Sequence, residues 1–216
     1  MSRWKYLRTR AISAVILAPI ALVCLWIGGW LWVALIAAIA AGLALEWREL
    51  TRFGRSLPLR LTGIPYIGLA TAALIWMRAD PAAGRANVLF VVLIVWAGDI
   101  GAYLAGRIIG GPKLAPAISP GKTWSGAAGG LCAAILVALC HGITARAALV
   151  AVALSVVAQA GDLLESDLKR MLGVKDSGHL IPGHGGLFDR LDGMLTAAPV
   201  AALLAAAVGP GVELWR

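Results

Sequence analysis

The chain has 216 residues, of which 60% are hydrophobic and only 14% are charged, and its mean hydropathy is +0.85. This composition is far more apolar than that of a water-soluble domain of similar length, so it excludes a soluble enzyme and indicates an integral membrane protein. The 19 Lys and Arg outnumber the 11 Asp and Glu, which gives a formal net charge of +8.

Taken in chain order, the sequence contains seven apolar stretches of about bilayer length. The first, residues 11–27, follows a basic segment and has no clear small-residue cleavage site after it, so we expect it to act as both signal and anchor. The other spans are predicted at residues 30–45, 61–77, 88–109, 125–140, 147–164 and 193–208. The predicted fold class is therefore all-α, a polytopic integral membrane protein with about seven transmembrane helices.

The basic residues are distributed unequally between the two sides of the predicted membrane. All but four of the 19 Lys and Arg lie in the N-terminal segment or in the second, fourth and sixth connections between spans. Because Lys and Arg are enriched in cytoplasmic segments, this pattern predicts a cytoplasmic N-terminus and an odd number of spans. Topology and anionic lipid headgroups account for the positive charge, so we expect membrane lipids and no nucleic acid as partners.

Asp99 lies near the middle of the fourth predicted span. An ionised side chain costs roughly 2.5–3.5 kcal/mol at this depth, so something must compensate for it. Gly98, Gly101 and Gly106 would allow a neighbouring helix to approach closely, and Asp99 is then either a structural carboxyl between helices or a functional group. The general rule that ionisable groups within membranes are functional favours the second interpretation.

The fourth connection contains the segment Ser119-Pro120-Gly121-Lys122-Thr123. Its last three residues resemble the end of a P-loop, but Pro116 occupies the place of the first glycine and membrane spans flank the segment, which argues against that motif. We expect a turn at the start of a helix, with Lys122 and Thr123 available to phosphate. The alternative is a positively charged loop whose serine caps the next helix.

Four polar residues share one face of the sixth span near its cytoplasmic end. Asp162, Glu165, Ser166 and Lys169 follow the spacing i, i+3, i+4 and i+7, and Arg170 lies at the edge of this face. A solvated helix end with salt bridges is the structural alternative. The long apolar approach to Asp162, however, would place these acids at membrane depth.

A glycine-rich loop at residues 181–186 precedes the last span, and its glycines can turn backbone N–H groups toward an anion. The charged residues around it are Lys175, Asp176, Asp189, Arg190 and Asp192. Carboxylates on two helix ends beside basic residues suit a metal–polyphosphate site, and hard oxygen ligands favour Mg²⁺. His179 and His184 have no HExxH motif or cysteine pair with them, so they do not indicate zinc.

Together these motifs resemble the signature of the phosphatidate cytidylyltransferases, membrane enzymes that make CDP-diacylglycerol. From Ser166 to Asp192 the pattern reads S-x-L-K-R, four residues, K-D-x-G, two residues, I-P-x-H-G-G-L-x-D-R-L-D. Further similarity lies in Gln159, Gly161 and Asp162, in residues 98–103 and in residues 119–124, so it covers the chain from about residue 98 onward. The chain departs from the family where Gly121 replaces a second lysine and Ser125 a glutamate, and its N-terminal part is shorter.

The resemblance implies that CTP and phosphatidic acid react to give CDP-diacylglycerol and pyrophosphate. It also implies one transmembrane domain (1–216), with residues 1–90 as scaffold and residues 91–216 as catalytic core, in a bacterial inner membrane with its active site facing the cytoplasm. The nucleophile is a phosphate monoester that is already ionised, so no catalytic triad is required. The site must instead reduce the repulsion between two anions and stabilise the leaving pyrophosphate.

Carried over residue by residue, the resemblance assigns three groups of functional residues. The catalytic group is Asp162, Lys169, Arg170, Asp189 and Asp192. The metal ligands are Asp162, Asp189 and Asp192, which would bind Mg²⁺, with a second cation such as K⁺ left open. The substrate-binding group is Asp99, Ser119, Lys122, Thr123, Glu165, Ser166, Lys175, Asp176, His184, Gly185, Gly186 and Arg190.

Two other functions would use similar residues. A CTP-dependent lipid kinase of the dolichol kinase type would transfer the terminal phosphate and release CDP. A secondary transporter would also place acids in its spans, but the sequence has no matching pair of interrupted helices. The acyl-chain preference, the choice between CTP and dCTP, and the oligomeric state, a homodimer included, are left open by the sequence.

Overall fold

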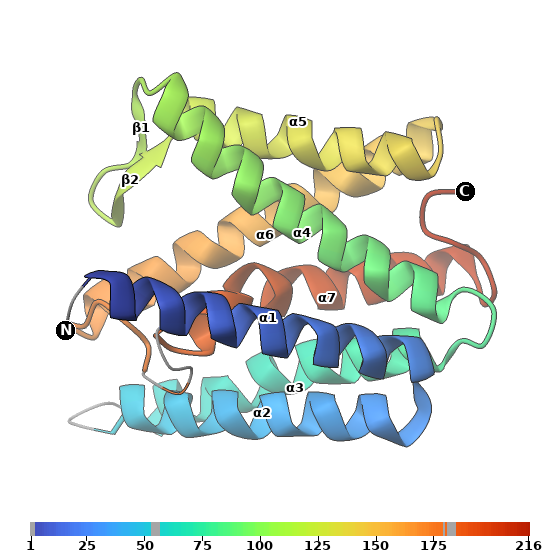
Figure 1. Cartoon of the computed structure of the whole chain (residues 1–216), viewed down its shortest axis with the longest axis horizontal. Coiled ribbons are helices and arrows are strands. Elements are labelled where there is room, and N and C mark those ends of the chain that lie inside the picture. Colours follow the sequence, from blue (N-terminus) through green and yellow to red (C-terminus); the bar gives the residue numbers. More distant parts are fainter. Residues whose placement is uncertain (1–2, 53–56, 179, 181–184) are drawn as a thin grey trace.

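The computed structural model describes residues 3–52, 57–178, 180 and 185–216, without the side chains of residues 3–14. Within these residues the chain forms seven helices and two short strands. The helices are α1 (Arg3–Ile27), α2 (Gly29–Leu50), α3 (Leu57–Ala79), α4 (Gly84–Ile108), α5 (Trp124–His141), α6 (Ala145–Met171) and α7 (Phe188–Val208). The strands β1 (Lys113–Ala115) and β2 (Ser119–Thr123) pair antiparallel between α4 and α5 (Figure 1).

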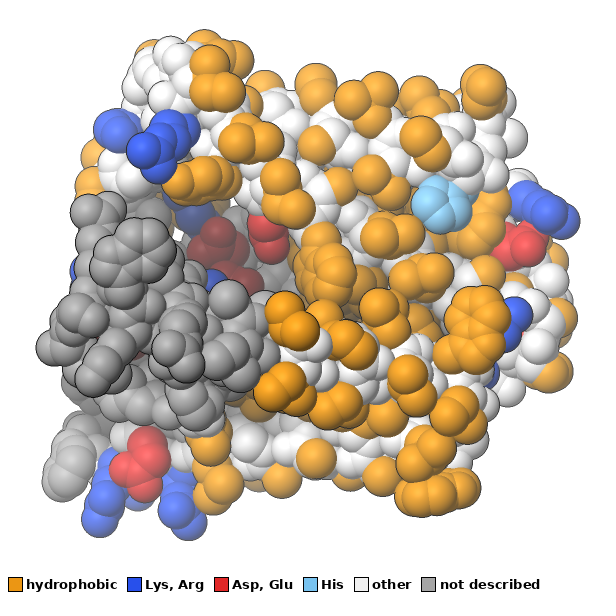
Figure 2. All heavy atoms as spheres, in the orientation of Figure 1, with side chains coloured by type: hydrophobic (Ala, Val, Ile, Leu, Met, Phe, Trp, Pro, Cys, Tyr) orange, Lys and Arg blue, Asp and Glu red, His pale blue; other side chains and the backbone are white. Residues whose placement is uncertain are grey.

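The helices confirm the prediction of a polytopic all-α membrane protein. Six of them, α2 to α7, are long and apolar enough to cross a membrane, and the apolar part of α1 is Val15–Ile27. Each predicted span lies within one helix, which commonly extends beyond it, except that the span predicted at residues 88–109 ends one residue after α4. Figure 2 shows apolar side chains across the middle of the molecule and charged ones gathered toward its two ends, as a bilayer requires.

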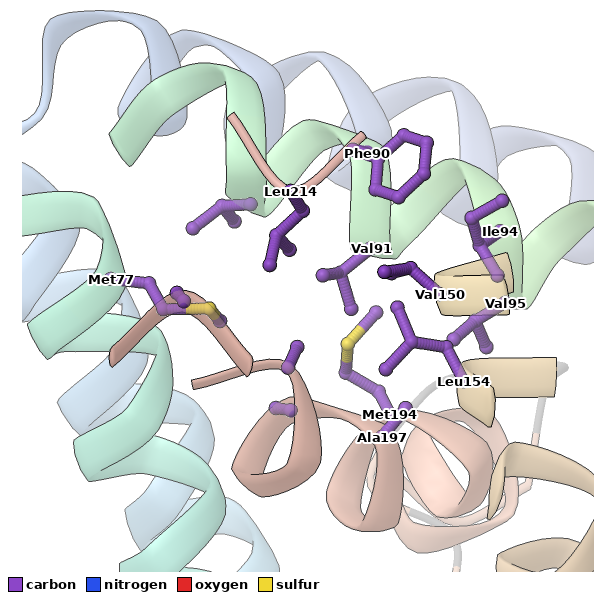
Figure 3. Packing of buried hydrophobic residues seen from close by; sticks show 14 of the residues in the cluster. Met77, Phe90, Val91, Ile94, Val95, Val150, Leu154, Met194, Ala197 and Leu214 are labelled. Atoms are coloured by element: carbon purple, nitrogen blue, oxygen red, sulfur yellow. The ribbon is translucent and has the colours of Figure 1, made fainter. Parts of the chain in front are cut away.

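Helix α4 lies at the centre of the main core. Its fully buried residues Phe90, Val91 and Ile94 pack against Leu154 of α6 and Met194 of α7 (Figure 3). A helix that is apolar on several faces and has helices around it is well suited to this central position. The core thereby fixes the relative positions of α6 and α7, the two helices that carry the signature residues.

Helices α4 and α5 pack with almost no side chain between them at one point. A Cβ added to Gly101 would lie 2.7 Å from the carbonyl oxygen of Gly129, and one added to Gly130 would lie 2.7 Å from that of Gly98. Contacts this short leave room only for glycine, which is a common device at membrane helix interfaces. The expectation that the glycines around Asp99 allow close helix approach is therefore confirmed.

The connection between α4 and α5 differs from the predicted turn at a helix start. Residues 119–123 form strand β2, in which Ser119 pairs with Ala115 and Thr123 pairs with Lys113. Alternation along the strand places Lys122 and Thr123 on different sides. Our prediction missed this hairpin because Pro and Gly within a short polar segment favour a turn over a strand.

Segments that are distant in sequence meet at one end of the bundle (Figure 1). The β1–β2 hairpin, the N-terminal end of α1, the C-terminal end of α2 and the start of α7 all lie there. These are the segments in which the sequence concentrates Lys and Arg. The prediction that alternate connections share one side of the membrane is therefore consistent with the helix arrangement.

The C-terminal tail folds back onto the opposite end of the bundle. The amide of buried Asn87 donates to the Val212 carbonyl at 3.1 Å and its oxygen accepts the Leu214 N–H at 2.8 Å. The Asp80 carboxylate accepts the Gly211 N–H at 2.5 Å, and this bond together with the N–H of Ala83 lowers the pKa of Asp80. The side chains of Asn87 and Asp80 thus hold the C-terminal tail in place through hydrogen bonds to its backbone.

We predict that Asn87→Ala destabilises the protein by about 1–3 kcal/mol, because it leaves a buried N–H and a buried carbonyl of the tail without partners. Thermal unfolding in detergent micelles measures this change. Leu149→Ala, at a position that is 69% exposed on α6, is the control and should have little effect. Equal melting temperatures for Asn87→Ala and the wild type would contradict the prediction.

Candidate active site

An ion pair joins the hairpin to helix α6. Lys122 of β2 places its Nζ 2.7 Å from Oδ2 of Asp162, with side-chain exposures of 24% and 39%. Asp99 of α4 lies within electrostatic range of both groups. Nearby, the Arg170 Nε donates to the Ile118 carbonyl at 3.3 Å, so α6 holds the hairpin at a second point. The connection between α4 and α5 thus converges with Asp99 and Asp162.

The ammonium group of Lys169 lies between two carboxylates that come from different helices. The Lys169 Nζ is 3.3 Å from Oε1 of Glu165 and 2.7 Å from Oδ1 of Asp189. All three side chains are largely buried, with exposures of 15%, 5% and 12%. The charge of Lys169 is the main compensation of the Glu165 carboxylate, and the Asp192 side chain lies within hydrogen-bonding reach of it.

The Asp189 carboxylate is held in place by backbone groups of the loop before α7. The Ser177 N–H donates to its two oxygens at 3.3 Å and 3.1 Å, and the Gly186 N–H donates to Oδ2 at 3.0 Å. These bonds correct our expectation for Gly186, because its N–H is directed to a side chain of the protein and not toward a phosphate. Gly185, with φ of +82°, adopts the left-handed conformation that favours glycine.

Acidic side chains outnumber the cations in this cluster. Asp192 lies within electrostatic range of Asp162 and Glu165, and the Tyr66 hydroxyl lies within range of Glu165 and Asp192. Figure 2 shows acidic side chains at the bottom of a hollow between apolar helices. Five acidic side chains therefore lie near two ammonium groups, and this surplus of possible oxygen ligands favours binding of a further cation.

The donor set fits a hard cation such as Mg²⁺. The cluster offers carboxylate oxygens, and those of Glu165 are largely buried beside Lys169 and Asp192. Within the described residues, however, no three acids, His or Cys already lie close enough together to hold an ion. Because Mg²⁺ commonly uses only one or two carboxylates and completes its shell with water and substrate phosphates, the assignment of Asp162, Asp189 and Asp192 stays a prediction.

The remaining predicted residues fall into three groups. Thr123 is buried and caps α5 by accepting the Gly126 N–H at 3.1 Å, which corrects the expectation that it binds phosphate. Ser119 and Ser166 are half-buried. Lys175 and Asp176, in the loop before α7, and Arg190, in the first turn of α7, are exposed. The substrate-binding roles of these five residues stay predictions. His184 and His179 lie outside the described residues.

An apolar cavity of about 270 Å³ reaches the charged cluster from between α3 and α6. Its lining includes Tyr66, Leu164 and Phe188, and it ends at Glu165 and Lys169. An acyl chain could occupy such a space while a polar headgroup remains beside the lysine. The cavity therefore joins the hydrocarbon region to the charged cluster.

Our sequence analysis missed Glu46, which lies near the end of α2 and is only 3% exposed. Its Oε1 accepts the Leu187 N–H at 2.8 Å and its Oε2 accepts the Phe188 N–H at 2.9 Å, so it occupies the first free donors of α7. The one signal in the sequence is an acid within the apolar stretch Gly-Leu-Ala-Leu-Glu-Trp. That signal does not identify the partner, Leu187, which is 141 residues away in the sequence.

Comparison with known proteins supports the interpretation of these motifs. The profile described as "Cytidylyltransferase family" matches residues 58–208. A "Phosphatidate cytidylyltransferase" of Brucella suis is 43% identical over 178 residues, which cover 80% of this chain and 64% of the relative. Proteins of the same name from Haemophilus influenzae and Staphylococcus epidermidis are 42% and 41% identical, over 64% and 67% of this chain and 52% and 57% of their own lengths. The chain thus spans less than two thirds of these relatives.

We predict that Lys169→Met destabilises the protein by about 3 kcal/mol, because it leaves two largely buried carboxylates without their shared cation. Denaturant unfolding in micelles measures the change. The double variant Glu165→Gln/Lys169→Met should recover part of the loss, since it removes one of the uncompensated charges. Lys175→Met, at an exposed lysine, is the control, and an equal loss there would contradict the prediction.

Proposed function

We infer the function of this chain from one premise, which is that it belongs to the cytidylyltransferase family. We propose that it transfers the cytidylyl group of CTP to phosphatidic acid and releases pyrophosphate. The names of its relatives support this reaction. The observation that carries the proposal is the convergence of Lys122 and Lys169 with acids of α6 and α7 beside an apolar cavity.

In the proposed reaction an oxygen of the phosphatidate monoester attacks the α-phosphorus of CTP. A new P–O bond forms as the bond between the α-phosphorus and the bridging oxygen to the β-phosphate breaks, and pyrophosphate leaves with the electron pair. Lys122 and Lys169 would lower the repulsion between the two anions, each exchanging a carboxylate partner for a phosphate oxygen. The chain supplies positioning and charge, and no covalent intermediate is needed.

We further propose that the reaction depends on Mg²⁺. Asp162 and Asp192 would hold the ion, and Glu165 would lie beside them. The N–H groups of Ser177 and Gly186 would orient Asp189 at the same site. When bound, the ion would neutralise charge on the phosphates and the departing pyrophosphate. The surplus of acidic side chains over ammonium groups and the buried position of Glu165 beside Asp192 support this dependence.

The site would face the cytoplasm of a bacterial inner membrane, where CTP is available. The concentration of Lys and Arg at the end of the bundle that contains the site supports this orientation. Phosphatidic acid would keep its acyl chains in the bilayer and in the cavity between α3 and α6, while its headgroup meets the nucleotide beside Lys169.

An assay of purified protein with labelled CTP, phosphatidic acid and Mg²⁺ tests the function. CDP-lipid and pyrophosphate in equal amounts are the expected products. Release of CDP with a phosphorylated lipid would instead identify a lipid kinase. Uptake into proteoliposomes without turnover would identify a carrier, and either result would reject the proposal.

We predict that Asp189→Asn lowers kcat by at least about 100-fold, because an amide cannot accept from the Lys169 ammonium and two N–H groups as the carboxylate does. Pyrophosphate release measures the loss, and a melting curve near that of the wild type establishes that the variant is folded. Asp167→Asn, at a half-buried aspartate of the same helix end as Lys169, is the matched control. Wild-type turnover in Asp189→Asn would reject its role.

We also predict that removal of divalent ions with EDTA abolishes pyrophosphate release and that excess Mg²⁺ restores it, because the carboxylate surplus alone repels the substrate phosphates. The melting temperature is measured in parallel, so that loss of activity is separated from unfolding. Undiminished turnover in EDTA would show that the lysines suffice without an ion.

A further inference from the structure

The contacts of Glu46 extend beyond the cap of α7. The Ser177 hydroxyl donates to Glu46 Oε2 at 3.4 Å and accepts the Asp189 N–H at 3.3 Å, while the Ser177 N–H donates to the Asp189 carboxylate at 3.1 Å. One serine therefore links the carboxylate of α2 to the aspartate of α7. The link is buried, since Ser177 is 4% exposed.

The described residues on either side of this link lie close together. A Cβ added to Gly178 would lie 2.7 Å from the Glu46 Oε1, and one added to Gly186 would lie 2.8 Å from the Gly178 N. Gly178 thus lies against both Glu46 and Gly186. A change in the Glu46 side chain would therefore move the backbone that holds Asp189.

Charge explains why a carboxylate occupies this place. The N-terminus of a helix carries a partial positive charge and free N–H donors, and it attracts anions, phosphate included. Glu46 and Asp189 take the N–H groups of Gly186, Leu187 and Phe188, so the protein's own anions satisfy the start of α7. The substrate phosphates are thereby left to the lysine side chains.

We propose that Glu46 is a positioning residue for the reaction: it fixes the start of α7 and, through Ser177, the orientation of Asp189. The proposal rests on the proposed function for its kinetic part only. Glu46 lies outside the residues that match the family profile, 58–208, so the profile assigns it no role. Helix α2 would then be part of the working site as well as a scaffold.

Hydrogen exchange tests the positioning directly and needs no activity. In Glu46→Gln one of the two acceptor oxygens becomes an NH₂ donor, so the amides of Leu187 and Phe188 should exchange about tenfold faster or more. Glu49→Gln, at an exposed glutamate one turn further along α2, is the matched control and should leave this exchange unchanged. Unchanged exchange in Glu46→Gln would overturn the proposal.

Kinetics separate positioning from simple destabilisation. In folded Glu46→Gln, kcat should fall about tenfold while KM for CTP changes by less than about twofold, because binding groups are kept and orientation is lost. If that variant does not fold, Ser177→Ala, which keeps both backbone bonds of Glu46, should show the same pattern to a smaller degree. Normal kcat in both folded variants would overturn the role in catalysis, and inactive wild type would refute only the proposed function.

A second and independent observation concerns a larger cavity, of about 600 Å³, between α2 and α3. Its walls include Ala44 and Gly68, and three arginines, Arg48, Arg52 and Arg60, lie at its charged end. Glu49 pairs with Arg48 and Arg52, and Arg60 donates to the carbonyls of Thr51 and Arg52, so these contacts hold three guanidinium groups at this end of the groove. Basic pockets between transmembrane helices at this depth are typical sites for anionic lipid headgroups.

We infer that one anionic phospholipid occupies this groove, with its phosphate near Arg48 and an acyl chain along Gly68. Native mass spectrometry of protein extracted from mixed phosphatidylglycerol and phosphatidylcholine vesicles tests this, and a single retained phosphatidylglycerol is expected. Gly68→Phe should abolish retention, because a Cβ added at Gly68 meets no neighbouring atom within 4 Å and the ring would project into the groove that Gly68 lines. Arg48→Gln should weaken retention about fivefold.

Two variants control for general effects on lipid binding. Leu69→Phe adds bulk at a 62% exposed position of the same helix, and Arg107→Gln removes a positive charge from the end of α4. Both should retain the lipid as the wild type does. Equal retention of phosphatidylcholine, or unchanged retention in Gly68→Phe, would overturn the inference, whatever the outcome of the enzyme assay.

Discussion

Compensation of carboxylate charge at the edge of a membrane is the constraint on which the rest of this structure depends. Acids at this depth are costly unless cations or hydrogen-bond donors accompany them. Lys122 compensates Asp162, and Lys169 compensates Glu165 and Asp189. Each lysine joins a different pair of segments, so the requirement to balance charge also determines how the hairpin, α6 and α7 assemble.

The balance is incomplete, and this incompleteness is what makes the cluster suitable for chemistry. Among the described residues of the cluster, Asp99 and Asp192 form no ion pair. Glu165 and Asp189 share one cation, Lys169. A structure built only for stability would replace such acids with apolar residues. A site of the proposed kind, which would hold a divalent ion and two phosphorylated substrates, would benefit from such acids and from lysines that can change partners.

The N-terminal helices take part in this arrangement. The predicted division at residue 90 separates a scaffold from a catalytic core, but Glu46 of α2 caps α7 and Tyr66 of α3 lies within range of two carboxylates of the cluster. Trp47 and Phe188, whose rings lie 5.7 Å apart, join the same two helices through apolar contact. The end of α2 thus contacts the start of α7 by hydrogen bonds and by packing.

The sequence by itself determined the helices, because bilayer-length apolar runs and the distribution of Lys and Arg are local properties. It also placed Asp162, Glu165 and Lys169 on one face, since helical spacing fixes that relation. Only the tertiary structure decided which partners these residues have. The Glu46–Phe188 bond joins residues 142 positions apart, and the pairing of Lys122 with Asp162 depends on a hairpin that turn-forming residues concealed. Such contacts follow from how the helices and the hairpin pack together, which no local pattern encodes.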